Sequence, residues 1–558
     1  MTPPLESNSF KVVLVGIAGS NNAFSLSLYN LKAFAYNNPE IRNKYDLSII
    51  QHPLINTNRK ELEIPPLIEK IVEAKPHLVG FSCYMWNVNF FREIAKTLRK
   101  RIPETQILWG GPEMSSDYLM KGQFDDFEMD FCIFGEGEVT FLELLNNRVL
   151  NTPEYSNIPG LAYRENPASP LKINSKREPL ESLQKVPSPF LTGILDDEVL
   201  LRPKIEANIE TQRGCNLRCS FCIYHKDMDR ITYSTANRVT DEVRYVVNKG
   251  VKRVRFVDAN FSSDLEYSKT IIRALIKEKF ELRLMLELIP GFIDEELASL
   301  FEEFNSLHEW NDITLGVGVQ STKLATLKTV RRGIKIEKFE YTFELIRKHN
   351  LFAKIDLIIG LPGESLSDIE NTLEYMMEAV RYGQCHLLCF HVMRGLPGTE
   401  LLEIARKYNM IFSSKNEPHE FMESPDLPRK DMLKCLRRTA VVFRLTNHRG
   451  WSRREFIREN KSNDVSIREA FFEKREKLNL TNIELVDHLI EGLLDHLRER
   501  NSWFVQPDFP FAETWWWNYS AFEVRDKWII NYLEGLKPQR KISSSPASLP
   551  CKNVLSNA

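Results

Sequence analysis

Apolar residues in the first 150 positions alternate between short solid runs and helical spacing. The solid runs, two of which have glycines at or near their ends, are KVVLVGI (11–17), HLVGFSCY (77–84), QILWGG (106–111) and DFCIFGEGE (130–138). Helical spacing follows at 67–74, at 90–102 and from VTFLELL onward. This alternation predicts an α/β fold with a doubly wound, Rossmann-like parallel sheet over residues 10–150.

A second strand–helix series occupies residues 201–420. Its apolar runs lie at 206–212, 252–258, 282–288, 312–320, 353–360 and 385–393, with helical patterns between them. Six consecutive β/α units predict a partial, open (β/α)6 barrel rather than a full eight-stranded one. Residues 151–200 are rich in Pro, Asn and Ser, which favours a linker with little regular structure.

The last part of the chain is predicted to be mainly helical over 425–535. Thr481 and Glu484 have the spacing of a capping box before an apolar helical pattern. Residues 429–461 hold eleven Lys/Arg and three Asp/Glu, which fits a solvated helix face or a dock for an acidic substrate or leader peptide. The aromatic stretch 503–522 fits core packing or a substrate pocket, and the polar tail 538–558 is predicted to be disordered.

Composition narrows the class of protein only a little. The 558 residues are 43% hydrophobic and 27% charged with a formal net charge of -2, so no nucleic-acid partner is expected. No run reaches the ~18 apolar residues of a membrane span, and the first residues lack a secretory signal. Three of the nine cysteines crowd into eight residues, which indicates a metal site in a reducing cytoplasm.

The segment GCNLRCSFC places Cys215, Cys219 and Cys222 at the spacing C-x3-C-x2-C. Thiolates suit iron, and a cubane cluster usually takes four of them, so three leave one iron open for a substrate. The alternatives are a structural zinc site with a distant fourth ligand, or buried core thiols. Zinc sites usually pair two C-x2-C units, and no second unit exists here. Cys385 and Cys389 lie on one face of a predicted strand, where core packing is expected.

Polar residues and glycine also end the other predicted barrel strands, where parallel barrels place their active sites. They are Asp258, Asn260, Glu287, Gln320, Ser321, Gly360 and Arg394.

The cysteine segment, with Phe221 before its last cysteine, resembles the signature of the radical S-adenosylmethionine (SAM) superfamily. The resemblance implies that a 4Fe–4S cluster binds SAM at its open iron. An electron from a donor such as flavodoxin or ferredoxin then cleaves SAM to methionine and a 5′-deoxyadenosyl radical.

GVQS and IIGLPGE are similar to SAM-contacting segments of that superfamily. This places Gln320 and Ser321 near the SAM ribose or methionine, and Ile358 and Gly360 near the adenine. Many members hold the SAM amino group with Gly-Gly-Glu after the second strand. This chain has VDANF there, so Asp258 either takes that role or caps a turn, and Glu287 ends the third strand toward the same site.

A doubly wound sheet binds a flat cofactor at its switch point, and a nucleotide, a flavin or a corrin would all be possible. The GxxGS at 16–20 fits neither a dinucleotide fingerprint nor a phosphate-binding loop. The cofactor-binding candidates at the strand ends are Ser82, Tyr84, Trp86, Asn87, Gly110, Gly111, Gly135, Glu136 and Gly137.

GFSCYMWN, LWGGPE and FGEGEVTFLELL resemble the cobalamin-binding domain fused ahead of many radical SAM domains, and the resemblance covers about residues 10 to 400. The D-x-H-x-x-G segment that supplies an axial histidine in other cobalamin enzymes is missing, so no protein imidazole is expected on the cobalt.

The family implies a cobalamin-dependent radical SAM methyltransferase that methylates an unactivated carbon of a natural-product, other small-molecule or peptide substrate. One alternative is a cobalamin radical SAM enzyme that cyclises or rearranges its substrate without methyl transfer. The other is a non-catalytic corrinoid or iron–sulfur carrier.

Overall fold

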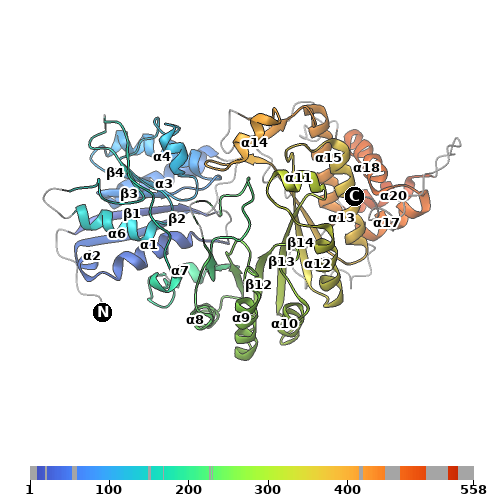
Figure 1. Cartoon of the computed structure of the whole chain (residues 1–558), viewed down its shortest axis with the longest axis horizontal. Coiled ribbons are helices and arrows are strands. Elements are labelled where there is room, and N and C mark those ends of the chain that lie inside the picture. The colour runs from blue at the N-terminus through green and yellow to red at the C-terminus, as the bar shows by residue number, and fades with distance from the viewer. Residues whose placement is uncertain are drawn as a thin grey trace.

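The computed structural model describes residues 9–18, 22–52, 60–148, 153–167, 169–195, 197–224, 226, 228, 230–413, 419–446, 466–497 and 526–537. A sheet flanked by helices stands beside a second, barrel-like unit, and the C-terminal helices pack on the far side of that unit (Figure 1). The aromatic stretch 503–522, the tail 538–558 and residues 447–461 of the basic run lie outside the described residues. Within the described part of the chain, no helix is both long and apolar enough to cross a membrane.

The first sheet has a parallel core in the order β2-β1-β3-β4-β5. Its strands are β1 (Phe10–Ile17), β2 (Tyr45–His52), β3 (Leu78–Ser82), β4 (Gln106–Gly110) and β5 (Phe131–Ile133). The helices around it are α1 (Leu26–Tyr36), α2 (Pro39–Lys44), α3 (Lys60–Ala74), α4 (Val88–Arg101), α5 (Ser116–Met120) and α6 (Gly137–Arg148). The strand order reverses between β1 and β3, which is the switch point of a doubly wound sheet.

Alternate residues of β1 serve two separate cores, one on each face of this sheet. Val13 and Val15 belong to one apolar cluster, and Val12 and Leu14 to the other. Both faces are therefore buried, as a parallel sheet between helices requires. The strand β2, at the edge, was not predicted because only its first residues are well buried and its apolar pattern is weak.

The segment expected to be a linker extends this sheet. Its strands β6 (Leu161–Tyr163) and β7 (Lys172–Ile173) add to β5 in antiparallel fashion. All three residues of β6 are buried, so a short apolar triplet in Pro- and Asn-rich surroundings was enough to form a strand. The segment ends with a 3-10 turn, η2 (Leu183–Lys185), and with α7 (Asp197–Leu200).

The second unit is an open parallel barrel of six strands in the order β8-β11-β12-β13-β14-β15. They are β8 (Ala207–Ile209), β11 (Arg253–Phe256), β12 (Arg283–Leu288), β13 (Asp312–Gln320), β14 (Phe352–Ile359) and β15 (Leu387–Val392). The connecting helices are α8 (Ala236–Asn248), α9 (Leu265–Glu278), α10 (Glu295–Ser306), α11 (Leu324–Thr329), α12 (Ile336–Lys348) and α13 (Leu366–Arg381). Each strand pairs with the next one along the chain, as six β/α units in series predict.

Two small sheets lie at the ends of the barrel strands. One pairs β9 (Gln212–Arg213) with β10 (Thr232–Tyr233), and the other joins β16 (Arg394–Gly395), β17 (Ile411–Phe412) and β18 (His419–Glu423). The short helix α14 (Leu401–Lys407) follows β16. These pieces hold the loops around the barrel mouth in place.

The C-terminal part contains α15 (Arg429–Thr446), α17 (Ile467–Leu478), α18 (Asn482–Leu497) and α20 (Asp526–Gly535). The predicted capping box is confirmed, because Glu484 N donates to Thr481 Oγ1 and Thr481 N donates to Glu484 Oε2. The buried Arg438 of α15 binds Asp487 of α18 in bidentate fashion, at 2.8 and 2.6 Å, and also contacts Glu370 of α13. This part of the chain is thereby tied to the barrel.

Candidate functional site

The cysteine loop begins where the first barrel strand ends. Gly214 has φ +100°, and a Cβ there would stand 2.8 Å from the Arg230 carbonyl oxygen, so the turn into Cys215 needs glycine. Backbone bonds fix the middle of the loop, since Ser220 N donates to Val330 O at 3.0 Å and Ser220 O accepts from Leu401 N at 2.9 Å. The loop is therefore held by segments that follow the fourth and sixth barrel strands.

The three thiols of the loop lie at different depths. Cys219 is buried, and Cys215 and Cys222 are partly exposed. Burial raises the pKa of Cys222 to about 12 and also raises that of Cys215. Among the described residues, no three His, Cys, Asp or Glu side chains gather closely enough to hold a single metal ion. A cubane cluster requires less crowding, because each thiolate binds a different iron.

Arg332 stands beside these thiols and was not singled out in the sequence. Its Nη1 donates to Cys219 Sγ at 3.5 Å and its Nη2 donates to the Gly318 carbonyl, while its buried Nε has no hydrogen-bond partner among the described residues. A buried cationic donor with a free N–H suits a carboxylate or a thiolate. In the sequence, Arg332 lies in an Arg-Arg-Gly segment after a predicted helix, and such segments are too common to indicate a functional residue.

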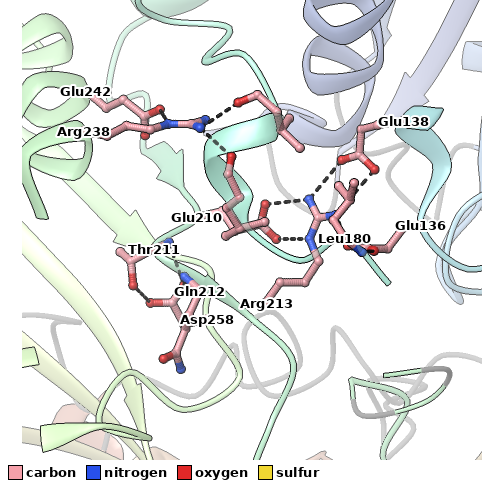
Figure 2. Close-up of polar contacts among 12 residues, drawn as sticks. Glu136, Glu138, Leu180, Glu210, Thr211, Gln212, Arg213, Arg238, Glu242 and Asp258 are labelled. Carbon is pink, nitrogen blue, oxygen red and sulfur yellow. Dashed lines mark hydrogen bonds and ion pairs between the residues drawn. The ribbon is translucent and has the colours of Figure 1, made fainter. Parts of the chain in front are cut away.

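Asp258 accepts hydrogen bonds from the residues that come just before the cysteine loop. Its Oδ1 accepts from the backbone N–H groups of Thr211 and Gln212 at 2.9 and 3.0 Å, and its Oδ2 accepts from Thr211 Oγ1 at 2.6 Å (Figure 2). Burial raises the pKa of this carboxyl to about 7, although these bonds act to lower it. The contacts favour the turn-capping role, because they occupy both carboxylate oxygens. Asn260 likewise serves the backbone, accepting from Ile289 N at 3.1 Å.

The other predicted SAM-side residues gather at the same end of the barrel. Gln320 has φ +71° at the end of β13, and the neighbouring Ser321 is buried and donates to Glu364. Ile358 and Gly360 end β14, and a Cβ on Gly360, at φ +89°, would overlap the Phe421 ring. Phe221 is half-buried next to Cys222.

A chain of alternating charges crosses the inner face of the barrel strands. Arg255 lies 2.6 Å from Glu206 and 3.7 Å from Glu287, and Lys354 lies 3.9 Å from Glu287. Asp356 completes the chain, 3.0 Å from Lys354 and 2.9 Å from His391. Burial acts to lower the pKa of Lys354, but the carboxylates of Asp356 and Glu287 hold that pKa above its usual value. Sequence reasoning found only Glu287, although charged residues at alternate positions of an apolar strand could have indicated the others.

The residues after β3 divide into two kinds. Asn87 is fully buried and structural, because its Nδ2 donates to the carbonyls of Ile17 and Ser82 at 3.2 and 3.1 Å. Tyr84 and Trp86 are half-buried and stack on each other with ring centroids 4.5 Å apart. The stacked rings form a flat apolar surface at the switch point.

The two glycines after β4 differ in what surrounds them. Gly111 has φ +102°, and a Cβ there would lie 2.6 and 2.7 Å from the backbone O and N of Cys83. At Gly110 a Cβ would meet only Ile133, at an ordinary 3.6 Å. Close backbone packing between β3 and β4 thus requires Gly111, but not Gly110.

The loop between β5 and α6 faces the barrel. Gly135 has φ +76° and open space around its Cβ position, and Gly137 begins α6. Glu136 and the buried Glu138 both bind Arg213, which lies two residues before Cys215 (Figure 2). Burial acts to raise the pKa of Glu138, but Arg213 and the N–H groups of α6 hold it below its usual value.

Further contacts join the sheet edge to the barrel mouth. Lys226, just after the cysteine loop, contacts Ser115, the N-cap residue of α5, and lies 3.9 Å from Asp117 of α5.

Two family models match the sequence. One, described as the radical SAM superfamily, covers residues 209–376, and the other, described as the B12 binding domain, covers residues 50–145. The first match covers most of the barrel, from the end of β8 to α13, and the second covers the first sheet from the end of β2 to α6.

Two curated relatives are similar over most of the barrel and sheet. The cobalamin-dependent radical SAM methyltransferase TokK of Streptomyces tokunonensis is 28% identical over 68% of this chain and 55% of its own length. The 2-(S-pantetheinyl)-carbapenam-3-carboxylate methyltransferase of Streptantibioticus cattleyicolor is 25% identical over 71% of this chain and 57% of its own length. The chain therefore spans somewhat more than half the length of these relatives.

Among solved structures, the radical SAM methyltransferase TsrM from Kitasatospora setae has the same fold. It aligns with a TM-score of 0.60 and 18% identity over 77% of this chain and 88% of its own.

Fold and site together define a radical SAM barrel preceded by a B12-binding sheet. The chain carries a radical SAM domain preceded by a B12-binding domain, as the sequence predicted, and the predicted α/β fold class is confirmed. The cofactors of these two domains are a 4Fe–4S cluster, SAM and cobalamin, as expected.

Proposed function

We propose that this chain is a cobalamin-dependent radical SAM methyltransferase that methylates an unactivated carbon of a small natural product. The observation that carries the proposal is that the cysteine loop is held against the B12-binding domain on both sides. Arg213, two residues before Cys215, binds Glu136 and Glu138, and Lys226, four residues after Cys222, contacts Ser115. A substrate at this junction would lie close to both cofactor sites.

The described residues suit the three groups. Cys215, Cys219 and Cys222 would hold the cluster, with Arg332 as a cationic donor beside them. Cobalamin would lie against the residues that end β3 and β4, namely Ser82, Tyr84, Trp86, Gly110 and Gly111. SAM would lie along the strand ends that carry Phe221, Glu287, Gln320, Ser321, Ile358 and Gly360.

Buried polar atoms without partners support a polar ligand in this region. Among the described residues they include Ser220 Oγ in the cysteine loop and Nε of Arg332, whose Nη1 contacts Cys219. Buried polar groups are normally hydrogen-bonded. A bound ligand would satisfy them.

When bound, the cluster and SAM supply a 5′-deoxyadenosyl radical and cobalamin supplies a transferable methyl group. The protein's own residues place the substrate between the two sites and exclude water that would intercept reactive species. The stacked Tyr84 and Trp86 offer an apolar wall, and the charge chain from Glu206 to His391 offers hydrogen bonds inside the barrel.

Methyl transfer is favoured over cyclisation or rearrangement by the relatives, since both curated ones are methyltransferases. The carbapenam carboxylate named for one of them supports a small natural product over a peptide. A carrier role is disfavoured because the barrel keeps the strand-end residues of a catalytic site. We further propose a flavodoxin or ferredoxin as the electron donor, a cytoplasmic location and no nucleic-acid partner.

The cluster assignment is tested first. Replacing Cys215, Cys219 and Cys222 together by Ala should abolish bound iron after anaerobic reconstitution and abolish 5′-deoxyadenosine formation from SAM. Cys385→Ala is the matched control, because that thiol is buried in the apolar core away from the loop. Full iron content in the triple variant would reject the assignment.

The reaction type is tested with SAM that carries deuterium in its methyl group. Methylation predicts 5′-deoxyadenosine and S-adenosylhomocysteine in a ratio of about one to one, with the label in the product. The carbapenam carboxylate of the relative is the first substrate to try. A product that forms together with deoxyadenosine but never gains the label would favour cyclisation or rearrangement.

A further inference from the structure

Arg213 binds three carboxylates at once, and these four residues are named here the Arg213 cluster (Figure 2). Its guanidinium is bidentate to Glu210, with Nε–Oε1 2.9 Å and Nη2–Oε2 2.8 Å. Nη1 lies 2.5 Å from Glu136 Oε1, and Nη2 lies 3.0 Å from Glu138 Oε1. A guanidinium has five N–H donors in a rigid plane, so one side chain can serve all three partners.

The members of the Arg213 cluster come from different parts of the fold. Glu136 and Glu138 belong to the B12-binding domain, at the turn from β5 into α6. Glu210 follows the first barrel strand, and Arg213 lies in β9. The second oxygen of Glu136 accepts from Leu180 N at 2.5 Å, in the segment that connects the two domains. Two stretches of chain therefore meet at the guanidinium, and the connecting segment joins them through Glu136.

The Arg213 cluster is largely shielded from solvent. Without Arg213, its three carboxylates would have no counter-charge. The exposed fractions of the side chains are 17% for Arg213, 10% for Glu136, 7% for Glu138 and 24% for Glu210. Three carboxylates around one guanidinium repel one another as soon as it is removed. Loss of one partner from a buried ion pair is strongly destabilising, because the remaining charges stay buried without compensation.

The position of Glu138 also bears on where cofactors can bind. Its carboxylate lies at the N-terminus of α6, a place that favours negative charge. The helix end is thus already served by a side chain of the protein, and that side chain faces Arg213. Glu136 is also bound to Arg213, so its carboxylate has a partner within the protein and need not be assigned to a cofactor.

We propose that Arg213 is a positioning residue that fixes the cysteine loop against the B12-binding domain, and that Glu136 and Glu138 serve this contact rather than binding cobalamin. Arg213 is followed directly by Gly214 and Cys215, so a shift of its guanidinium moves the start of the cysteine loop. The cluster therefore sets the separation of the two cofactor sites. This inference goes beyond the proposed reaction and does not depend on it.

The test uses the full-length protein and compares Arg213→Gln with a triple variant that also carries Glu136→Gln and Glu138→Gln. The measurements are hydrogen–deuterium exchange at 135–138 and 213–222, and the midpoint of thermal unfolding. Arg213→Gln should raise exchange in both segments by about tenfold or more and lower the midpoint. The triple variant should regain at least half of the loss, because it removes the carboxylates that repel one another.

Two further variants sharpen the result. Arg213→Lys keeps the charge but not the planar fork, and should fall between wild type and Arg213→Gln. Arg177→Gln is the matched control, because Arg177 binds Glu143 and Thr140, which both belong to the same helix α6. It should leave exchange at 213–222 unchanged. The proposal is overturned if Arg213→Gln loosens only 213–222, or if the triple variant is no better than the single one.

Discussion

Replacing Gly111 by alanine provides a sharp test of what the glycine pair after β4 does. Gly111 has φ +102°, and the added Cβ would lie 2.6 and 2.7 Å from the backbone O and N of Cys83. Backbone atoms inside a sheet cannot move aside as a flexible side chain can. Gly110→Ala is the matched control, because its Cβ would make only ordinary contacts with Ile133.

The expected cost of Gly111→Ala has two sources. An alanine forced into the positive-φ region costs roughly 1–2 kcal/mol. Overpacking against a fixed backbone adds about 1–3 kcal/mol. Since 1 kcal/mol shifts the midpoint of a domain this size by about 2–4 °C, the B12-binding domain should melt roughly 10 °C lower. Gly110→Ala should be neutral or slightly stabilising, because alanine restricts the unfolded chain more than glycine does.

Differential scanning calorimetry of protein prepared without cobalamin measures this directly. Gly111→Ala should lower the first unfolding transition, and Gly110→Ala should leave it in place. The alternative explanation is that Gly110 and Gly111 both lack a side chain so that cobalamin can approach the backbone. In that case both variants would keep the midpoint of the cofactor-free protein and lose only cobalamin binding, and that outcome would refute the steric argument.

Two other variants test buried charges. Burial raises the pKa of Asp258 to about 7, so the stability that this carboxyl contributes is present below about pH 4 and is lost as the pH rises through about 7. Asp258→Asn keeps hydrogen-bonding groups toward Thr211 and should flatten that slope in urea unfolding at several pH values; an unchanged slope would assign the titration elsewhere. Arg438→Met should lower the free energy of unfolding by about 2–3 kcal/mol, because Asp487 and Glu370 lose their shared cation. A loss below about 0.5 kcal/mol would show that the contact is worth no more than a surface ion pair.

The fold was predictable where the apolar pattern was long and regular. The six barrel strands occur where the apolar runs predicted them, because alternate residues of each strand are buried in the apolar core that the helices cover. The edge strand β2 and the short strands β6 and β7 were missed. Edge and three-residue strands are stabilised by a neighbour already in place, and this leaves little trace in the local sequence.

Site residues could be predicted where their spacing in the sequence indicates their chemistry, as for the three cysteines. Residues that contribute through contacts with distant parts of the chain could not be predicted. Arg332 contacts Cys219, which is 113 positions away in the sequence, and Arg213 contacts Glu136, which is 77 positions away in the sequence. A single sequence gives no measure of such distances, so Glu136 was assigned to a cofactor when its visible partner is an arginine.

The antiparallel strands β6 and β7 bear on how the chain can be divided. A cut at residue 150, where the composition changes, would remove Ile158 and Leu161 from the apolar cluster under the first sheet and expose the pairing edge of β5. Unpaired sheet edges and stripped apolar faces are common causes of aggregation during expression. A fragment meant to carry the first domain alone should therefore run to about residue 178, beyond Arg177, which still binds Glu143 of α6.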